Sequence, residues 1–123
     1  MMAMNVLIVD DLAFIKIVLR DILEKAGFRV AGEASSGAQA LTMYQDVRPD
    51  VVLMDITMPD MDGLTALQKI KEIDPAARVI MCSALGQQKL IVQAIQLGAM
   101  DFIVKPFQPP RVVSALKKAL DIS

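Results

Sequence analysis

The chain has 123 residues, of which 54% are hydrophobic, so it has the length of one folded domain and enough apolar side chains to bury a core. Its 13 basic and 14 acidic residues nearly cancel, which argues against electrostatic attraction to nucleic acid or to an anionic membrane. Because the chain has no histidine and Cys82 is its only cysteine, disulfides, thiolate zinc sites and histidine-based catalysis are excluded. No uncharged stretch is long enough to span a membrane and no secretory signal is visible, so we expect a soluble, cytoplasmic protein.

Five apolar runs of strand length alternate with five helical patterns along the chain. The expected strands are Met4–Val9, Phe28–Ala34, Asp50–Asp55, Arg78–Ser83 and Met100–Lys105. The expected helices are Leu12–Lys25, Ser36–Asp46, Asp62–Ile73, Gln87–Leu97 and Arg111–Leu120. This alternation predicts one α/β domain over residues 1–123, with a parallel sheet that is covered by helices on both faces.

Local signals mark the ends of several expected helices. Asp62 is suited to cap the amino end of the third helix, because its side chain can accept a free backbone N–H. Ser36 and Gln39 have the spacing of a capping box at the start of the second helix. Pro109 and Pro110 lie at the entry of the last helix, where the backbone needs no N–H donor.

Polar or charged side chains lie at the carboxyl ends of four of the expected strands: Asp10 with Asp11, Asp55, Ser83 and Lys105. In a parallel sheet these ends share one edge, so side chains that are far apart in sequence can meet in one pocket. Asp55 is the clearest of them, because it ends an apolar run and Pro59 prevents a helix from starting directly after it.

Each of these residues also has a purely structural interpretation. Asp10 and Asp11 could cap the first helix. Ser83 could cap the segment after its strand, and Lys105 could be a solvated strand end. Structural roles explain each residue alone better than they explain five such groups at one edge of a sheet.

The predicted cluster of Asp10, Asp11 and Asp55 has a definite chemistry. Three carboxylates close together repel one another and resist ionising together. A hard divalent cation removes this conflict, and carboxylate and carbonyl oxygens with retained waters suit Mg²⁺. Asp55 can then attack phosphorus and form an aspartyl phosphate, while Lys105 and Ser83 bind other phosphoryl oxygens. The residues therefore predict a phosphoryl-accepting site.

Four motifs follow one another along the chain: VDD at Val9–Asp11, MDITMPDMDG at Met54–Gly63, CSA at Cys82–Ala84 and DFIVKPF at Asp101–Phe107. In order and spacing they resemble the receiver domain of two-component response regulators. The resemblance covers essentially the whole chain and is strongest to the stand-alone receivers of chemotaxis systems. It implies a single flavodoxin-like (βα)5 doubly wound domain, with a five-stranded parallel sheet in strand order 2-1-3-4-5.

The resemblance also implies roles for the acidic residues. Asp55 corresponds to the phosphoacceptor of the family. Asp11 and Asp55 correspond to direct Mg²⁺ ligands, and Asp10 to a residue that helps through water. The backbone carbonyl of Thr57 completes the implied protein ligands.

A second group of residues corresponds to the family's switch. Ser83 and Lys105 match the residues that bind the phosphoryl group after transfer. Phe102 matches the aromatic position that moves inward when the hydroxyl residue moves to the phosphate, although its pattern alone favours a core aromatic. The bond between Lys105 and Pro106 matches one that is cis in the family.

By resemblance, the chain is a signalling switch that catalyses only its own phosphorylation and autodephosphorylation and is otherwise not an enzyme. The expected phosphodonor is a histidine kinase of the CheA type and the expected target is the flagellar motor switch, with a phosphatase of the chemotaxis system as a further partner. Because no effector domain is attached, we expect a monomer that signals through its last two helices and the strand between them. Arg111, Lys117 and Lys118 would give that surface a basic rim.

Three other functions fit part of the pattern. A phosphorelay intermediate, which passes its phosphate to a histidine phosphotransfer protein, would need the same pocket and is the main alternative. A phosphatase of the haloacid-dehalogenase kind also uses Asp, Ser or Thr, Lys and Mg²⁺, but Thr57 stands where that class needs a second aspartate. A flavodoxin-like FMN binder is disfavoured, because Asp10 and Asp11 would repel the cofactor's phosphate and the chain has one Tyr and no Trp.

Overall fold

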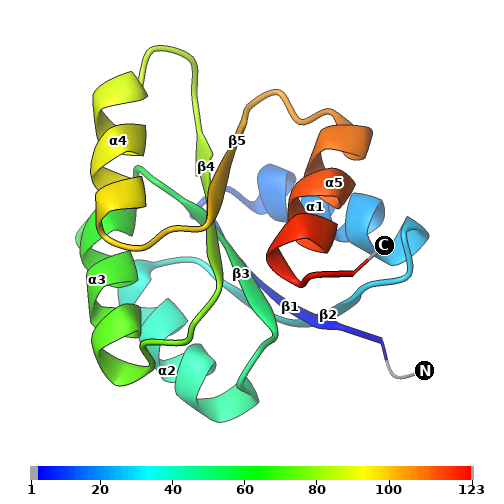
Figure 1. The fold of residues 1–123 in the computed structure, drawn as a ribbon, viewed down its shortest axis with the longest axis horizontal. Coiled ribbons are helices and arrows are strands. Elements are labelled where there is room, and N and C mark those ends of the chain that lie inside the picture. The colour runs from blue at the N-terminus through cyan, green and yellow to red at the C-terminus, as the bar shows by residue number, and fades with distance from the viewer. Residues whose placement is uncertain (1–2, 123) are drawn as a thin grey trace.

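The computed structural model describes residues 3–122 as a five-stranded sheet with helices on both faces (Figure 1). The strands are β1 (Asn5–Val9), β2 (Arg29–Ala34), β3 (Val51–Asp55), β4 (Val79–Ser83) and β5 (Asp101–Val104). The helices are α1 (Ala13–Lys25), α2 (Gly37–Val47), α3 (Gly63–Ile73), α4 (Gln88–Gln96) and α5 (Pro109–Ala119). All neighbouring strands pair parallel in the order β2-β1-β3-β4-β5, so the predicted flavodoxin-like fold and strand order are confirmed.

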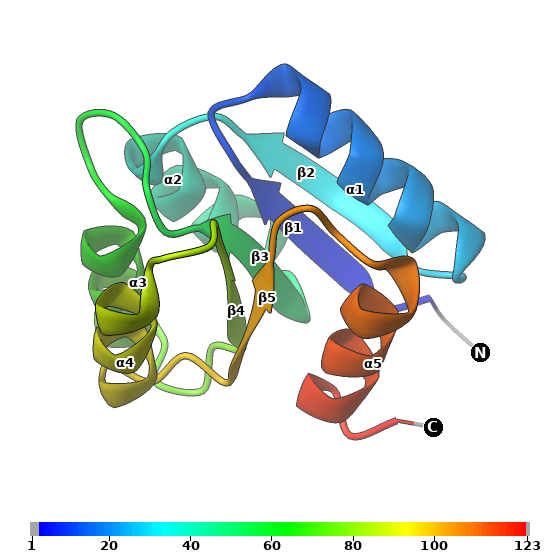
Figure 2. The same cartoon turned by 90° about the horizontal axis from the view of Figure 1, so that it is seen from above.

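Two apolar cores lie on the two faces of the sheet. Helices α1 and α5 cover one face, and α2, α3 and α4 cover the other (Figures 1 and 2). Successive residues of a strand point to opposite faces, so Leu7 and Val9 of β1 belong to one core while Val6 and Ile8 belong to the other. β3 is buried along its whole length because it is the central strand. Its last residue, Asp55, therefore lies in the middle of the carboxyl edge.

Most elements differ from the predicted ranges by one residue at an end. The largest difference is α5, which begins at Pro109 rather than at Arg111. Pro109 and Pro110 occupy the first two helical positions, because the fixed φ of proline suits a helix and the missing N–H groups would have no partner there. The predicted entry of this helix thus belongs to the helix itself.

Side chains cap two of the helices as the sequence predicted. Asp62 accepts the Thr65 N–H at 2.8 Å, and Ser36 Oγ accepts the Gln39 N–H at 3.1 Å. The reciprocal bond of the capping box goes one residue further back, because Gln39 Oε1 accepts the N–H of Ser35 and not that of Ser36. Both caps stabilise helices on the same face of the sheet.

The start of α1 differs from the capping interpretation of Asp11. The residue that precedes the helix is Leu12, which has no capping side chain. Asp10 Oδ1 accepts the Leu12 N–H at 2.9 Å, whereas Asp11 is exposed. One carboxylate of the VDD motif thus holds the turn before α1, and the other is left at the surface.

Between residues 3 and 122, the structure contains no helix that combines the length and apolar character needed to cross a membrane.

Candidate metal and phosphoryl site

Three carboxylates meet at the carboxyl edge of the sheet. Asp10 follows β1 and Asp55 ends β3, and the pairing of Val9 with Met54 places these two aspartates side by side. One carboxylate oxygen from each of Asp10, Asp11 and Asp55 lies within 4.8 Å of the other two. Asp10 and Asp55 are buried, while Asp11 is exposed. The cluster therefore combines two desolvated acids with one that faces water.

Lys105 is the cation of this cluster. Its Nζ atom lies 3.0 Å from Asp10 Oδ2 and 3.4 Å from Asp55 Oδ1. Burial lowers the pKa of Lys105, but the hydrogen bond to Asp10 and the charges of Asp55 and Asp10 outweigh burial, so the pKa is raised overall. Lys105 thus keeps its positive charge at neutral pH.

The carboxyl group of Asp55 has a raised pKa. Burial is the largest cause and repulsion from Asp10 the next, and the attraction of Lys105 offsets them only in part. The site therefore holds three carboxylates against one ammonium group. A divalent cation would neutralise the excess, and Mg²⁺ prefers carboxylate oxygens of this kind. The donor set fits Mg²⁺, with Asp10, Asp11 and Asp55 as the side chains that could hold it.

Ser83 supplies a hydroxyl group at the same edge. It ends β4 and directly follows Cys82, which is the pairing partner of Asp55. The Ser83 side chain is fully buried, and its Oγ atom has no hydrogen-bond partner within residues 3–122. A buried hydroxyl without a partner is costly, so it is exceptional in a folded protein. Ser83 is thus available to an acceptor that enters the site.

Thr57 lies in the loop after β3, two residues beyond Asp55. Its N–H group donates to Asp55 Oδ1 at 3.3 Å, and its side chain is exposed. Its hydroxyl accepts a hydrogen bond at 2.8 Å from the side-chain amide of Gln87, at the end of the loop that follows β4. The metal-binding role of the Thr57 carbonyl stays a prediction.

The backbone that carries Asp55 packs directly against the start of α3. The Gly63 N–H donates to the Ile56 carbonyl at 2.8 Å. A Cβ atom at Gly63 would lie 2.2 Å from the Asp55 carbonyl oxygen and 2.8 Å from the Ile56 Cα atom, both far closer than atoms can approach. Only glycine fits this position, and it fixes the backbone of the acceptor residue from behind.

Phe102 is not a member of the carboxylate cluster, although Lys105 lines one of the hollows that it borders. It is half-buried in β5 and borders two hollows of about 360 and 300 Å³, one toward α5 and one toward α4. The second hollow is also lined by Leu85 and Ile91. The predicted output surface thus contains recesses beside its aromatic residue.

The peptide bond between Lys105 and Pro106 is cis, as the resemblance implied.

Arg111, one of the three residues of the expected basic rim, makes an ion pair within the chain. The Arg111 guanidinium pairs with Asp101 at 2.9 Å and donates to the Phe102 carbonyl at 2.7 Å, while its side chain stays exposed. Lys117 and Lys118 make no ion pair within residues 3–122, and both line a different surface, a groove between α1 and α5.

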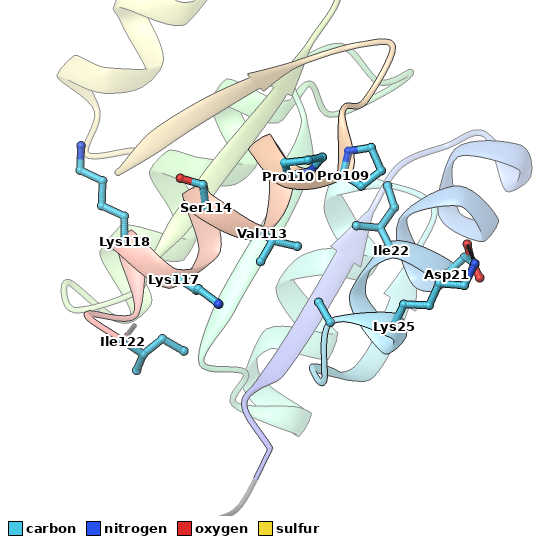
Figure 3. A pocket seen from close by; sticks show the side chains of 11 residues that line it. Asp21, Ile22, Lys25, Pro109, Pro110, Val113, Ser114, Lys117, Lys118 and Ile122 are labelled. Carbon is cyan, nitrogen blue, oxygen red and sulfur yellow. Dashed lines mark ion pairs between the residues drawn. The ribbon is translucent and has the colours of Figure 1, made fainter.

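This groove has a volume of about 800 Å³ (Figure 3). Ile22 and Val113 supply apolar lining, and Asp21 pairs with Lys25 at 3.2 Å on the α1 side. None of its lining residues belongs to the carboxylate cluster, so the groove is separate from the predicted phosphoryl site.

Comparison with known proteins agrees with this geometry. The family model for the response regulator receiver domain matches residues 6–117. The chain belongs to the response regulator receiver family. Among receivers, it is 58% identical to the chemotaxis protein CheY of Bacillus subtilis over 98% of this chain and 100% of that protein. It is 56% identical to CheY of Thermotoga maritima over 95% of this chain and 98% of that protein.

A solved receiver structure has the same fold. A chain of the crystal structure of the CheX-CheY-BeF3-Mg complex from Borrelia burgdorferi superposes with a TM-score of 0.89. The two chains are 42% identical, and the match covers 94% of this chain and 87% of that one. This receiver is therefore closely related to chemotaxis regulators in both sequence and fold.

The structure brings together most of the residues that the sequence singled out. Asp10, Asp11, Asp55 and Lys105 form one cluster, and Ser83 lies at the same edge. Sequence reasoning assigned no role near the site to Gln87. No pattern could have revealed this residue, because its bond to Thr57 joins loops that are 30 residues apart.

Proposed function

We propose that this receiver is a phosphorylation-controlled signalling switch of a chemotaxis system, with Asp55 as the phosphoacceptor. The observation that carries the proposal is the cluster itself: one carboxylate oxygen from each of three aspartates within 4.8 Å of one another, Lys105 paired to the two buried acids, and a Ser83 hydroxyl at the same edge that has no partner among residues 3–122. These are the groups that a phosphoryl acceptor needs around it.

Asp55 acts as the nucleophile. One of its carboxylate oxygens attacks the phosphorus of a phosphohistidine, so that a P–O bond forms while the P–N bond breaks. The departing imidazole nitrogen keeps the bonding electron pair and takes a proton from water. Lys105 places its ammonium group beside the acceptor and stabilises negative charge on the transferring phosphoryl oxygens.

The side chains of Asp10, Asp11 and Asp55 would hold Mg²⁺, together with the Thr57 carbonyl. When bound, the metal neutralises charge on the phosphoryl group and relieves repulsion within the cluster. Asp10 has a second role in the described structure, since it also pairs with Lys105 and holds the Leu12 N–H. This network keeps the lysine beside the acceptor.

After transfer, the phosphoryl group gives Ser83 the acceptor that its hydroxyl lacks. Movement of Ser83 toward the phosphate shifts the loop between β4 and α4, and the half-buried Phe102 side chain follows into the space that opens. The surface of α4, β5 and α5 then changes its affinity for a partner. To act as a switch, phosphorylation must favour the second state by a few kcal/mol.

The partners proposed are a histidine kinase of the CheA type as donor and the flagellar motor switch as target. The Borrelia burgdorferi structure contains CheY in a complex with CheX, which supports a further protein partner, and a phosphatase of the chemotaxis system is proposed for that role. Recesses around Phe102 suit a short peptide with apolar side chains. The protein would act as a cytoplasmic monomer, and it would catalyse only its own phosphorylation and dephosphorylation.

Intact-mass measurement after incubation with acetyl phosphate tests this function. We expect a Mg²⁺-dependent phosphate adduct in the wild type that hydroxylamine removes and that Asp55→Asn lacks. Asp60→Asn is the matched control, because Asp60 is an exposed carboxylate in the same loop and should keep the adduct. Turnover of acetyl phosphate without any adduct would indicate a phosphatase. The absence of both adduct and turnover would overturn the proposal.

A further inference from the structure

Gln87 joins the two loops on either side of Asp55 through one side chain. It precedes the first turn of α4, where it is the N-cap residue without capping its own helix. Its Oε1 atom accepts the Ala84 N–H at 2.6 Å, and its Nε2 atom donates to Thr57 Oγ1 at 2.8 Å. A neutral amide is suited to this task, because it offers a donor and an acceptor together and adds no charge beside the acidic cluster.

Both ends of this bridge are close in sequence to the reacting groups. Thr57 donates its own N–H to Asp55 Oδ1 at 3.3 Å. Ala84 directly follows Ser83, whose buried hydroxyl has no partner in the described chain. Since Asp55 pairs with Cys82 in the sheet, Ala84 leaves β4 at the level where Thr57 leaves β3. Gln87 thus joins the loop after β3 to the loop after β4, beside the acceptor.

The bridge also fixes the loop that must move. In the proposed mechanism the backbone between β4 and α4 moves with Ser83 toward the phosphoryl group, and in the described structure that backbone is held by the bond between Gln87 and Ala84. The Ala84 N–H is the next donor after the Ser83 hydroxyl, and in the described state it is already satisfied. A phosphoryl oxygen that seeks this N–H must displace Gln87.

We propose that Gln87 is a positioning residue that holds the loop between β4 and α4 in its unphosphorylated position and opposes closure of that loop on the phosphorylated aspartate. This inference rests on the proposed phosphoacceptor function. Gln87 contacts Thr57 only through the side-chain hydroxyl, so it affects the affinity for a phosphoryl group without bonding to any of the oxygen atoms proposed as Mg²⁺ ligands. The neighbouring Gln88 is exposed and makes no side-chain hydrogen bond in the described structure, so position 87 alone has this geometry.

Gln87→Met tests the proposal, because methionine has nearly the same length and lacks both the donor and the acceptor. Thr57→Val removes only the acceptor of the Nε2 bond and leaves the backbone intact, and Gln88→Met is the matched control. Each variant would be titrated with beryllofluoride, a stable phosphoryl mimic, at saturating Mg²⁺. The affinity for Mg²⁺ alone and the hydrogen-exchange rate of the Ala84 amide in the unliganded protein would be measured in parallel.

We expect Gln87→Met to bind beryllofluoride about two- to tenfold more tightly than the wild type, which is the range of one neutral hydrogen bond. The Mg²⁺ affinity should stay unchanged, and the Ala84 amide should exchange faster. Thr57→Val should give a smaller change in the same direction. The double variant should equal Gln87→Met rather than the sum, because both substitutions break one bridge.

The possible failures are distinguishable. If the wild type binds no beryllofluoride although Mg²⁺ binds, the phosphoacceptor function itself is wrong. If the wild type binds it and Gln87→Met binds with unchanged or lower affinity, the function stands and the role of Gln87 is refuted. Equal Ala84 exchange rates in Gln87→Met and Gln88→Met would also refute that role.

Discussion

Asp55 and Asp74 lie at opposite edges of the sheet, and their carboxyl groups have opposite environments. Asp55 ends β3 at the carboxyl edge, where burial and then the charge of Asp10 raise its pKa. Asp74 follows α3 at the amino edge, where Tyr44 Oη donates to it at 2.7 Å and the Ala76 N–H at 3.1 Å. These bonds lower the pKa of Asp74.

The two shifts have opposite consequences for folding. A lowered pKa means that the native state favours the ionised carboxylate, so Asp74 stabilises the fold at neutral pH. A raised pKa means that ionisation of Asp55 destabilises the fold over the same range. Ionised Asp74 therefore stabilises the fold at the amino edge of the sheet. Ionised Asp55 is electrostatically unfavourable at the carboxyl edge, where a bound cation can relieve the repulsion.

The largest effect is expected for Lys105→Met, which removes the only cation that pairs with the buried acids among the described residues. The rate of phosphorylation by acetyl phosphate should fall by about 100-fold or more, as for loss of a single charge-stabilising donor. Quenched-flow mass spectrometry measures this rate. Lys118→Met is the control, because Lys118 is exposed and makes no ion pair in residues 3–122, and a comparable loss there would contradict the assignment.

The next effect concerns stability. Because the native pKa of Asp55 lies above that of the unfolded chain, the native state binds more protons in the window between the two values. Wild-type stability therefore falls as the pH rises through this window, and Asp55→Asn lacks this loss. We expect the variant to be more stable by roughly 1 kcal/mol at neutral pH, as when a buried charge is neutralised.

Urea unfolding measures this difference, with Tyr44 as a fluorescent probe. The pH should run from about 3 to 8, a range that includes the titration of carboxylates and neutral pH. The advantage of Asp55→Asn should shrink in acid. Added Mg²⁺ should also shrink it, because the metal stabilises the wild type by binding the native state. A variant that is less stable than the wild type at neutral pH would show that the Asp55 charge supports the fold.

Asp62→Ala tests whether location or pairing decides the role of a carboxylate. Asp62 is close to Asp55 in sequence, but its side chain caps α3 through the Thr65 N–H at 2.8 Å. We expect a loss of about 1 kcal/mol in stability, which is typical of an N-cap, and an unchanged yield of phosphate adduct. Asp60→Asn is the control for the loss of charge in the same loop, because Asn tolerates the left-handed backbone of Asp60 (φ 69°), which Ala would strain. An adduct that disappears in Asp62→Ala would assign Asp62 to the chemistry.

Tyr44→Phe should have the smallest effect of these substitutions. The change should be confined to the surroundings of Asp74 at the amino edge of the sheet. The Tyr44 hydroxyl has a pKa raised to about 12, chiefly by burial and then by its bond to Asp74. Without that hydroxyl, the pKa of Asp74 should rise toward its ordinary value, and stability at neutral pH should fall slightly. NMR titration of the Asp74 carboxyl group detects the change, and an unshifted pKa would mean that the hydrogen bond is not formed in solution.

The sequence predicted the elements well because their signals are local. Runs of strand length located the five strands, four of which end in polar residues, and Asp62 and Ser36 marked helix starts through bonds to residues only three positions away. The strand order had no such signal. It depends on which strands pair across the whole chain, and it was available only through the resemblance to receivers.

The site was predictable as a set of residues and only partly as a geometry. The topology of a parallel sheet explains why Asp10, Asp55 and Ser83 share an edge. It does not indicate that Asp10 would be buried and Asp11 exposed, because this depends on how the chain turns into α1. Nor does it indicate the bridge made by Gln87, which depends on the positions of two side chains in separate loops.

The close contact behind the acceptor residue matters for protein engineering. At Gly63 there is room only for a hydrogen where other residues have a Cβ atom. The end of β3 and the start of α3 are therefore packed together as one rigid unit. A designer who transplants the Asp55 loop into another α/β scaffold must therefore carry the first turn of this helix with it. Grafting the loop alone would transfer the right side chains, but nothing would hold their backbone in position.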